Sequence, residues 1–430
     1  MGTTLVINPG SSSRKYALFH DRKSVVELRY EATNIGVEMC ASGTNSQQVC
    51  SAISREDFAS AFDRVAAEVK NYLQKDRRQL DTVCIRIVAP GTAFQKHQRI
   101  DDAYLTALRQ RESAAPLHIP TILLEIQRIR KHFPTVKMVA ASDSAFHATL
   151  PEVARNFSID RSDAEIFDIY RFGFHGLSVS SIVRRVHATT GANPERLIVC
   201  HIGNGASVTA VKDGKSVDTT MGFSPASGLP MGSRAGDLDP EGLLELMRLK
   251  NLKTAETEVY LNTRGGLQGL SGDSDIRQLL DRRTKGDAVA TGALDHFAYH
   301  VQKAIASFTV ALGGLDMVVL TGTAAVRSSE LRALLLGKLA HLGIVIDEDK
   351  NHALVGQDGT CSVHKSSVKV VVMRTDEMGE MAAIVDCLIS PARYQYEKTP
   401  ENTVELRAAC AVCVGVHVGA RRTHCRLDSS

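Results

Sequence analysis

Two copies of one local pattern, far apart in the sequence, constrain the fold of this chain more than any other feature. Residues 4–19 and 196–211 each read as an apolar strand, a tight turn rich in glycine and hydroxyl residues, and a second strand. Backbone N–H groups and hydroxyls in such turns suit the oxygens of phosphate. A phosphate-type hairpin that occurs twice predicts a duplicated fold with a ligand in the cleft between two lobes.

Helical patterns fill the sequence between these strands. Apolar residues recur with a helical period over 58–69 and 119–133, and 295–312 is a further long helix. A buried strand is predicted at 368–373 and a closing helix at 379–388. The alternation of strands and helices predicts the α/β class.

Composition excludes several classes of protein. The chain has 430 residues, 43% of them hydrophobic and 23% charged, with a formal net charge of +3. These values exclude a mostly disordered chain and give no reason to expect nucleic acid or a membrane as a partner. The longest apolar stretch, 304–326, contains Asp316 and two adjacent glycines, so a helix, a break and a buried strand explain it better than a membrane span. The first residues lack a signal-peptide pattern, and a cytoplasmic location is the default expectation.

The chain has nine cysteines, an odd number, and six of them are scattered along the sequence. Cys84, Cys200 and Cys387 lie in apolar runs, which is typical of reduced thiols in a core. Near the end of the chain, Cys410 and Cys413 with nearby histidines faintly resemble a zinc cluster, but their spacing fits no standard finger.

Two turns are candidates for binding phosphate. The turn 8–13 reads Asn-Pro-Gly-Ser-Ser-Ser, where Asn8 and a serine hydroxyl could also hold a metal-bound water. The alternative is an ordinary polar hairpin tip. The turn 201–207 contains glycines spaced as in a dinucleotide fingerprint, but Val208 stands at the third glycine position and a strand follows, which disfavours a Rossmann fold.

Three further segments carry reactive side chains. The loop 218–240 is long, rich in glycine, serine and proline, and contains Arg234, whose planar guanidinium suits phosphate or carboxylate. Asp143 follows an apolar strand, a common catalytic position, with a helix N-cap as the alternative. His175 lies between glycines, where a buried histidine bonded to the backbone is the alternative.

Taken together, these segments resemble the acetate kinase family, the carboxylate kinases of the ATPase superfamily that includes sugar kinases, Hsp70 and actin. The matching segments are 6–13, 115–118, 143–147, 170–178, 201–207 and 218–240. The resemblance implies a duplicated RNase H-like (actin-like ATPase) fold, with an active-site cleft between two lobes. It implies an N-terminal lobe of residues 1–146 with a closing helix at about 378–390, and a C-terminal lobe of residues 147–377 that binds nucleotide and forms a homodimer. The tail 391–430 lies outside the family pattern and has no assigned role.

The activity that the resemblance implies is reversible transfer of the ATP γ-phosphate to acetate, giving acetyl phosphate and ADP, with Mg²⁺ or Mn²⁺. A carboxylate nucleophile needs positioning and relief of charge repulsion rather than a general base. The matched catalytic residues are Arg86, His118, Asp143, His175 and Arg234.

The resemblance also implies three binding sets. The acyl pocket comprises Val88, Leu117, Phe174 and Pro225, with Arg86 holding the carboxylate. The nucleotide and its phosphates are assigned to Ser11, Ser12, Ser13, Lys15, His201, Gly203, Asn204, Gly205, Asp275, Ile276, Arg277, Thr323, Ala324, Ala325 and Arg327. The metal is assigned to Asn8 and Glu377.

The sequence departs from the family at several positions. Ala-Pro-Gly at 89–91 replaces His-Gly-Gly, and Ile119 and Ser142 replace other residues. The adenosine turn at 321–328 reads Thr-Gly-Thr-Ala-Ala-Val-Arg-Ser where the family has Thr-Gly-Gly-Ile-Gly-Glu-Asn-Ser. Because alanine resists positive φ, we expect this turn to approach a nucleoside less closely than the family's turn does.

These departures leave alternatives to an acetate kinase that uses ATP. The acceptor could be propionate or butyrate, or the donor could be pyrophosphate, for which Arg327 would supply a new positive charge. A third alternative is a binding protein without turnover. It is disfavoured because a binding remnant has little need of all five of the retained residues Arg86, Asp143, His175, Arg234 and Glu377.

Overall fold

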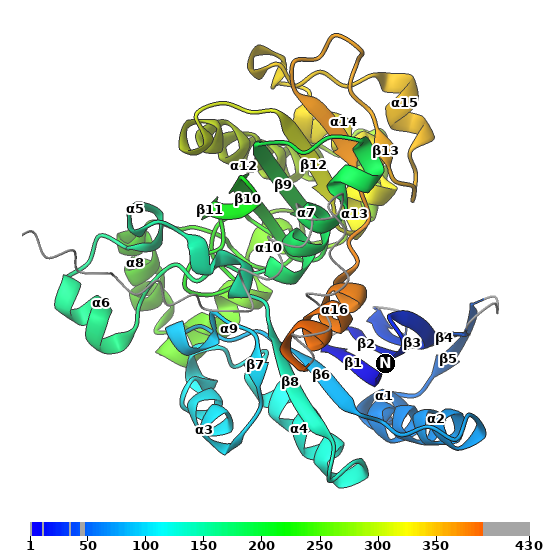
Figure 1. Cartoon of the computed structure of the whole chain (residues 1–430). Helices are drawn as coiled ribbons and strands as arrows, with labels where there is room; N and C mark the ends of the chain where they lie inside the picture. Colours follow the sequence, from blue (N-terminus) through cyan, green and yellow to red (C-terminus); the bar gives the residue numbers. More distant parts are fainter. Residues whose placement is uncertain (1, 11–12, 34–35, 44–47, 390–430) are drawn as a thin grey trace, which may run out of the picture.

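Two sheets form the framework of the computed structural model (Figure 1), which describes residues 2–10, 13–33, 36–43 and 48–389. The strand orders are β5-β4-β3-β2-β1-β6-β8-β7 and β11-β10-β9-β12-β14-β13. The first sheet comprises β1 (Thr3–Pro9), β2 (Ser13–His20), β3 (Lys23–Thr33), β4 (Gly36–Gly43), β5 (Val49–Ile53), β6 (Thr82–Ile87), β7 (Gln98–Arg99) and β8 (Lys137–Ser142). The second comprises β9 (Arg196–Ile202), β10 (Ala206–Lys212), β11 (Lys215–Thr219), β12 (Met317–Thr321), β13 (Gly359–Thr360) and β14 (Lys369–Val372).

The two sheets repeat one topology. In the first, β1 pairs antiparallel with β2 and parallel with β6, which pairs parallel with β8. In the second, β9 pairs antiparallel with β10 and parallel with β12, which pairs parallel with β14. The shared order confirms the predicted duplication and the α/β class.

Helices cover both faces of the first sheet. Because side chains alternate along a strand, Leu5 and Ile7 of β1 pack in the cluster that includes α2 and α4, whereas Val6 packs with Met381 and Ile384 of α16. The last described helix therefore returns to cover the sheet that opens the chain, and Figure 1 shows it beside β1 and β6.

The helices that precede the second sheet are α1 (Arg55–Ala59), α2 (Ala61–Lys75), α3 (Asp102–Gln110), α4 (Ile119–His132), α5 (Glu152–Arg155), α6 (Arg161–Phe167) and α7 (Gly176–Thr190). Those that follow are α8 (Pro240–Lys250), α9 (Thr254–Thr263), α10 (Gly266–Ser271), α11 (Ile276–Thr284), α12 (Ala288–Leu312), α13 (Thr323–Arg327), α14 (Ser329–Leu336), α15 (Glu348–Ala353) and α16 (Glu377–Ile389). The short 3₁₀ turns are η1 (Thr92–Phe94), η2 (Glu112–Ala114), η3 (Ala145–Thr149) and η4 (Ala340–Leu342). Among the described residues, no helix is long and apolar enough to cross a bilayer.

Most predicted helices and strands are confirmed, with differences at their ends. The predicted helix 119–133 is α4, and the strand at 368–373 is β14. The predicted helix 295–312 begins earlier, at Ala288, because Asp287 caps it by accepting from two backbone N–H groups. The predicted helix 58–69 is divided between α1 and α2, which meet at Ser60.

The first sheet contains a disulfide that the sequence did not predict. Cys40 in β4 and Cys50 in β5 stand directly opposite each other and are bonded, with their Cα atoms 4.0 Å apart. The predicted core thiols Cys84, Cys200 and Cys387 are buried. The tail 391–430, with its resemblance to a zinc cluster, lies outside the described residues.

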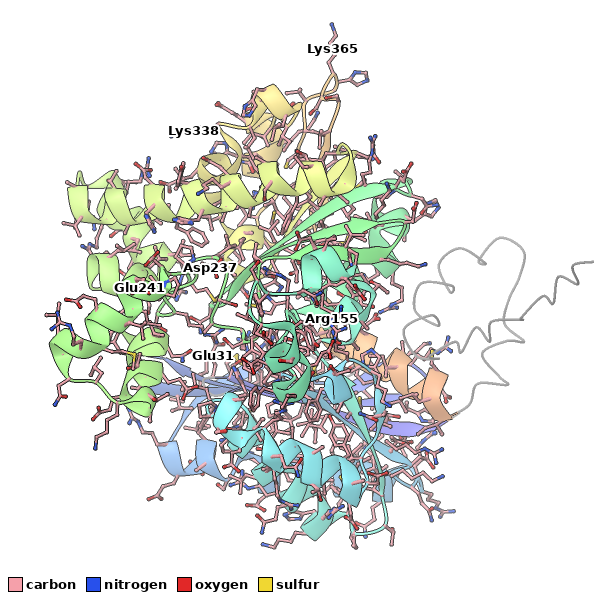
Figure 2. The ribbon with its side chains drawn as sticks, turned by 90° about the vertical axis from the view of Figure 1, so that its left-hand side faces the viewer. Glu31, Arg155, Asp237, Glu241, Lys338 and Lys365 are labelled. Atoms are coloured by element: carbon pink, nitrogen blue, oxygen red, sulfur yellow. A yellow bond between two sulfur atoms is a disulfide. The ribbon has the colours of Figure 1, made fainter. Side chains whose placement is uncertain are left out.

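Contacts join the two sheets and their helices on one side of the molecule. Asp168 accepts from the backbone N–H of Thr92 at 2.9 Å and from Arg111 Nη2 at 2.8 Å. Arg155 Nη2 donates to Thr92 Oγ1 at 3.4 Å. In Figure 2, Arg155 and Glu31 lie where the first sheet with its helices meets the second sheet with its helices. Lys338 and Lys365 lie at the far end of the second sheet's part of the molecule.

Buried histidines make a first prediction, for the pH dependence of stability. Burial lowers the pKa of both His97 and His147 to about 4. In the unfolded chain they take up protons at about pH 6.5, so protonation favours unfolding as the pH falls from about 6.5 to 4. Each unit of pKa difference is worth about 1.4 kcal/mol. We expect the urea midpoint to fall markedly between pH 7 and pH 5.

A measurement between pH 7 and pH 5 distinguishes the effect of the buried histidines on stability from that of the carboxylates. Carboxylates with a lowered pKa lose their stabilising contribution only below about pH 4, where they are protonated. The His97→Gln variant should therefore show a smaller loss between pH 7 and pH 5. Equal urea midpoints at the two pH values would contradict the prediction.

Candidate active site

Asp143 lies at the carboxyl end of β8, next to the end of β6, and is 1% exposed. Its backbone N–H donates to the Ile87 carbonyl at 2.9 Å, which continues the pairing of the two parallel strands. Its Oδ2 accepts from Arg86 Nη2 at 2.8 Å and from the backbone N–H of His175 at 2.8 Å. The strand ends thus bring together three of the predicted catalytic residues.

The Asp143 carboxyl is ionised in this setting. Burial alone would raise its pKa, but the Arg86 guanidinium and the His175 N–H hold the pKa below its ordinary value. Its Oδ1 is buried and has no hydrogen-bond partner among the described residues. A buried carboxylate oxygen without a partner is costly unless a ligand or ion completes its environment.

Asn8 and Glu377 lie on the other side of Arg86. Asn8 Oδ1 accepts from Arg86 Nη1 at 3.2 Å, and Asn8 Nδ2 donates to Glu377 Oε2 at 2.9 Å. Arg86 Nη1 lies 3.9 Å from the same Glu377 oxygen. Amide and carboxylate oxygens are the ligands that Mg²⁺ and Mn²⁺ prefer, so these residues, with the unpartnered Asp143 Oδ1, fit a divalent cation.

His175 is held directly above Asp143 by the start of α7. Its backbone is left-handed, with φ +61°, and Gly176 follows, whose N–H donates to the Asp143 carbonyl at 2.8 Å. A Cβ on Gly176 would lie 2.4 Å from that carbonyl oxygen, so only glycine allows this approach. His175 Nδ1 lies 2.9 Å from Ser207 Oγ, and its ring packs 4.2 Å from that of His201.

His175 is neutral near pH 7. Burial is the largest cause that lowers its pKa, and the charges of Arg86 and Arg234 and the neighbouring His201 lower it further. When the Ser207 hydroxyl donates to Nδ1, the proton of the ring is on Nε2, which can then donate to an oxygen of a ligand.

Arg234 is a half-buried cation without an ion-pair partner among the described carboxylates. Its Nη1 donates to the Pro225 carbonyl at 3.1 Å, which ties it to the loop predicted to line the acyl pocket. A Cβ on Gly205 would lie 3.2 Å from His175 Nε2 and 3.5 Å from Arg234 Nη1, so both groups border the space beside Gly205. Burial and the charge of Arg86 lower the pKa of Arg234. This is expected of a partly buried cation that has no anion beside it.

The other predicted substrate residues lie around this centre. Burial and the charges of Arg234 and Arg86 lower the pKa of His118 to about 4, so this histidine is neutral. Val88 and Phe174 are buried in one hydrophobic cluster, whereas Leu117 is 41% exposed. Of the four acyl-pocket residues, Leu117 is therefore the least enclosed.

The sequence matches the family model described as the Acetokinase family over residues 3–383. The chain belongs to this family. An acetate kinase of Streptomyces avermitilis is 36% identical over 403 residues, which cover 91% of this chain and 98% of the relative. An acetate kinase of Thermotoga maritima is 36% identical, with 87% and 95% covered.

Solved structures of the acetokinase type share the fold. A propionate kinase of Francisella tularensis has a TM-score of 0.79 at 29% identity, covering 89% of this chain and 98% of its own. The acetate kinase of Porphyromonas gingivalis has a TM-score of 0.75 at 29% identity, with the same coverage. The acetate kinase of Entamoeba histolytica has a TM-score of 0.77 at 26% identity, covering 90% and 100%.

Three of the segments predicted to bind nucleotide lie close together in the structure. A Cβ on Gly203 would lie 3.9 Å from the backbone nitrogen of Thr323, and one on Gly232 would lie 3.2 Å from both Asn204 Oδ1 and the Ser274 carbonyl. The turns at 203–205, 274–277 and 323–327 of this acetokinase-family chain are therefore neighbours.

The remaining predicted nucleotide residues have diverse settings. Asp275 caps α11 and pairs with Arg277 at 2.6 Å, and Ile276 is buried in the core. Lys15 is exposed on β2 opposite Asn8, and its charge helps to lower the pKa of His201, for which burial is the main cause. Ser13 begins β2, while Ser11 and Ser12 lie outside the described residues.

The altered adenosine turn contains a short helix. Residues 323–327 form the short helix α13, and positive φ occurs only at Gly322, with φ +84°. A Cβ there would lie 2.5 Å from the Ile202 carbonyl, so the retained glycine is the one that the turn requires. Ala324 and Ala325 are not among the residues with positive φ, and the expectation that the turn approaches a nucleoside less closely than the family's turn stays a prediction. Arg327 is exposed at the end of α13.

Sequence reasoning missed the hydroxyls that hold the histidines. Ser207 contacts His175, and Ser178 Oγ lies 2.8 Å from His201 Nδ1. Both serines are fully buried. The sequence does show a serine in each motif that contains one of these histidines. It does not show that His175 pairs with Ser207, 32 positions away, or that His201 pairs with Ser178, 23 positions away.

Proposed function

We propose that this chain catalyses the reversible transfer of the γ-phosphate of ATP to acetate, giving acetyl phosphate and ADP. The observation that carries the proposal is Arg234, a half-buried guanidinium that faces His175 Nε2 beside Gly205 and has no carboxylate partner among the described residues. Such a group is suited to a bound anion. Membership of the acetokinase family supports the same conclusion.

The residues of the chain perform three tasks in this reaction. A carboxylate oxygen of acetate attacks the γ-phosphorus in line with the leaving oxygen of ADP, and no proton has to be removed from the nucleophile. Arg86 and Arg234 reduce the repulsion between the two anions and hold them in line. Neutral His175 donates from Nε2 to a phosphoryl oxygen as charge develops there.

We assign Asn8, Asp143 and Glu377 to a divalent cation, Mg²⁺ or Mn²⁺, on the strength of their oxygen donors around Arg86. When bound, the cation would neutralise phosphate charge on the nucleotide. We assign the nucleoside to the space bordered by the turns at 274–277 and 323–327, and its phosphates to the turns at 8–13 and 203–205. The carboxylate of Asp143, held ionised, also fixes the guanidinium of Arg86 in place.

Propionate is a second candidate substrate. Leu117 of the predicted acyl pocket is 41% exposed, so one wall is open to a longer chain. A solved relative with a TM-score of 0.79 is named as a propionate kinase. We propose acetate as the preferred acceptor because Val88 and Phe174 are buried against the core and limit the depth of the pocket.

A donor panel tests the proposed function. Acetyl phosphate is trapped as the hydroxamate after incubation with acetate, Mg²⁺ and either ATP, GTP or pyrophosphate. We expect ATP to support turnover and pyrophosphate to give none, because Gly322 and the phosphate turns are retained. A reaction with pyrophosphate and none with ATP would contradict the assignment of the donor. No product with any donor would contradict the enzyme activity itself.

We further propose a homodimer that forms through the second lobe, residues 147–377, with the first lobe being 1–146 and the helix at about 378–390. In α8 no residue is buried, and Leu244, Leu249 and Val259 of α8 and α9 are 57%, 69% and 60% exposed. Exposed apolar side chains on adjacent helices are typical of a subunit interface.

Light scattering tests the dimer. At micromolar concentration we expect twice the mass of one chain, and we expect Leu249→Glu to weaken the association because a charge would be buried at the interface. A monomer for the unchanged chain would contradict the proposal. We also propose a cytoplasmic location.

A further inference from the structure

We infer that Glu380, Ser180, Ser181 and Arg184 form a clamp between α7 and α16 that positions the Glu377 carboxylate for its divalent cation. We call these four residues the α7–α16 clamp. The inference rests on the proposed function, because it concerns the cation of that same site. The four are positioning residues and need not touch the substrates.

Glu380 is the centre of the clamp. It is 3% exposed, its Oε1 accepts from Ser180 Oγ at 2.5 Å, and its Oε2 accepts from Arg184 Nε at 2.6 Å. A buried carboxylate is tolerated only when it is paired, so the α16 helix cannot rotate about its axis without a large cost. Glu377 lies three positions earlier on the same helix, on a neighbouring part of its surface.

Ser181 fixes the chain on the other side of Glu377. Its Oγ accepts from the backbone N–H of Asp376 at 3.1 Å and donates to the Ser178 carbonyl at 2.8 Å. Asp376 in turn caps α16, since its Oδ1 accepts from the Gly379 N–H at 2.9 Å. Glu377 is therefore bracketed at positions 376 and 380 by hydroxyls of a single turn of α7.

The α7 helix, whose serines contact the start of α16 on either side of Glu377, also contacts the two histidines of the site. α7 begins directly after His175, and Ser178 on its first turn contacts His201. The clamp thus fixes Glu377 relative to both histidines, although the two ends of the clamp are about 200 positions apart in sequence. Nothing in this contact set touches the acyl pocket or the nucleoside turns.

The clamp therefore predicts a specific defect in cation binding. Hydrogen-bond partners of a metal ligand typically change metal affinity by roughly 10- to 100-fold when they are removed. The clamp acts through the backbone of α16 and not on the Glu377 carboxylate itself, so we expect the lower end of this range. For Glu380→Gln, which keeps the shape but removes the charge facing Arg184, we expect roughly 10-fold weaker Mn²⁺ binding in the presence of ADP. For Ser180→Ala we expect a smaller weakening, and Ser180→Thr, which keeps the hydroxyl, should bind nearly as the unchanged chain does.

The measurement is the signal of free Mn²⁺ in electron paramagnetic resonance, with ADP present and the full chain. It is read beside a kinetic titration, in which we expect the half-saturating Mn²⁺ concentration to rise while kcat at saturating Mn²⁺ changes little. A matched control is Asp316→Asn. Asp316 pairs with Arg196 at the opposite end of β9, so this variant loses stability but should bind Mn²⁺ normally.

Three results would overturn the inference: Mn²⁺ binding that is unchanged in Glu380→Gln, an equal weakening in the Asp316→Asn control, or no Mn²⁺ binding by the unchanged chain. If Glu380→Gln fails to fold, Ser180→Ala and Ser180→Thr decide the question, because the first removes the hydroxyl that contacts Glu380 and the second keeps it. Failure of the proposed function is a separate observation, the lack of acetyl phosphate from the unchanged chain, which leaves the Mn²⁺ comparison valid.

Discussion

Replacing Arg234 with alanine should lower kcat by roughly a thousandfold or more, the scale of losing an arginine that stabilises a phosphoryl-transfer transition state. The guanidinium has no carboxylate partner among the described residues and borders the same space as His175 Nε2, so its charge is available to the reacting groups. Initial rates of acetyl phosphate formation measure the effect. Arg234→Lys should recover only part of the loss, because a point charge cannot replace two parallel hydrogen bonds.

The control for this experiment is an arginine that faces solvent. Arg161 is 91% exposed and pairs with Glu165 on α6, so Arg161→Ala should leave the rate unchanged. Circular dichroism and urea unfolding establish that the Arg234→Ala variant is folded. A folded variant with a nearly normal rate would exclude Arg234 from the mechanism.

Asp143→Asn should abolish most activity and also destabilise the fold. The asparagine can still accept from the His175 N–H, but the Arg86 guanidinium loses its carboxylate partner at 2.8 Å. Breaking a buried ion pair typically costs about 3–5 kcal/mol. We also expect kcat to fall by roughly a hundredfold or more, since the oriented groups act at the transition state.

A second substitution separates the two effects. In Asp143→Asn combined with Arg86→Met, the guanidinium that lost its closest carboxylate is also removed, so stability measured by urea unfolding should return part of the way toward its original value. The return is only partial because Glu377, 3.9 Å from Arg86 Nη1, loses this cation. Activity should not return, because the reacting anions still lack Arg86, one of the two arginines proposed to hold them in line. If the double variant is as unstable as Asp143→Asn alone, the ion pair is not the cause of the destabilisation.

The ends of the strands that carry site residues were predictable because they depend on residues that are adjacent in the sequence. An apolar run followed by Asp143, and a second followed by the turn at 201–207, each indicate a strand and the polar residue at its end. The duplicated hairpins likewise indicated the repeated topology before any contact was known. The position of Arg234 near His175 came from resemblance alone, since the loop that carries it has no periodic pattern.

Other features could not be predicted because they depend on distant pairs. Cys40 and Cys50 pair only because β4 and β5 adopt one particular register, and register depends on the whole sheet. Ser180 and Glu380 meet only after α16 returns to the first sheet. The helix α13 needs positive φ only at Gly322, a detail that the substitution of neighbouring glycines does not reveal.

The return of α16 to the first sheet has a consequence for synthesis on the ribosome. Val6, Cys84 and Val139 on one face of that sheet are covered by Met381, Ile384 and Val385, which emerge only after the second sheet has been made. At roughly 5–20 residues per second, the nascent sheet waits tens of seconds with this apolar face uncovered. A chaperone that shields hydrophobic surface during translation should therefore raise the yield of this chain, and truncation before α16 should send it into aggregates.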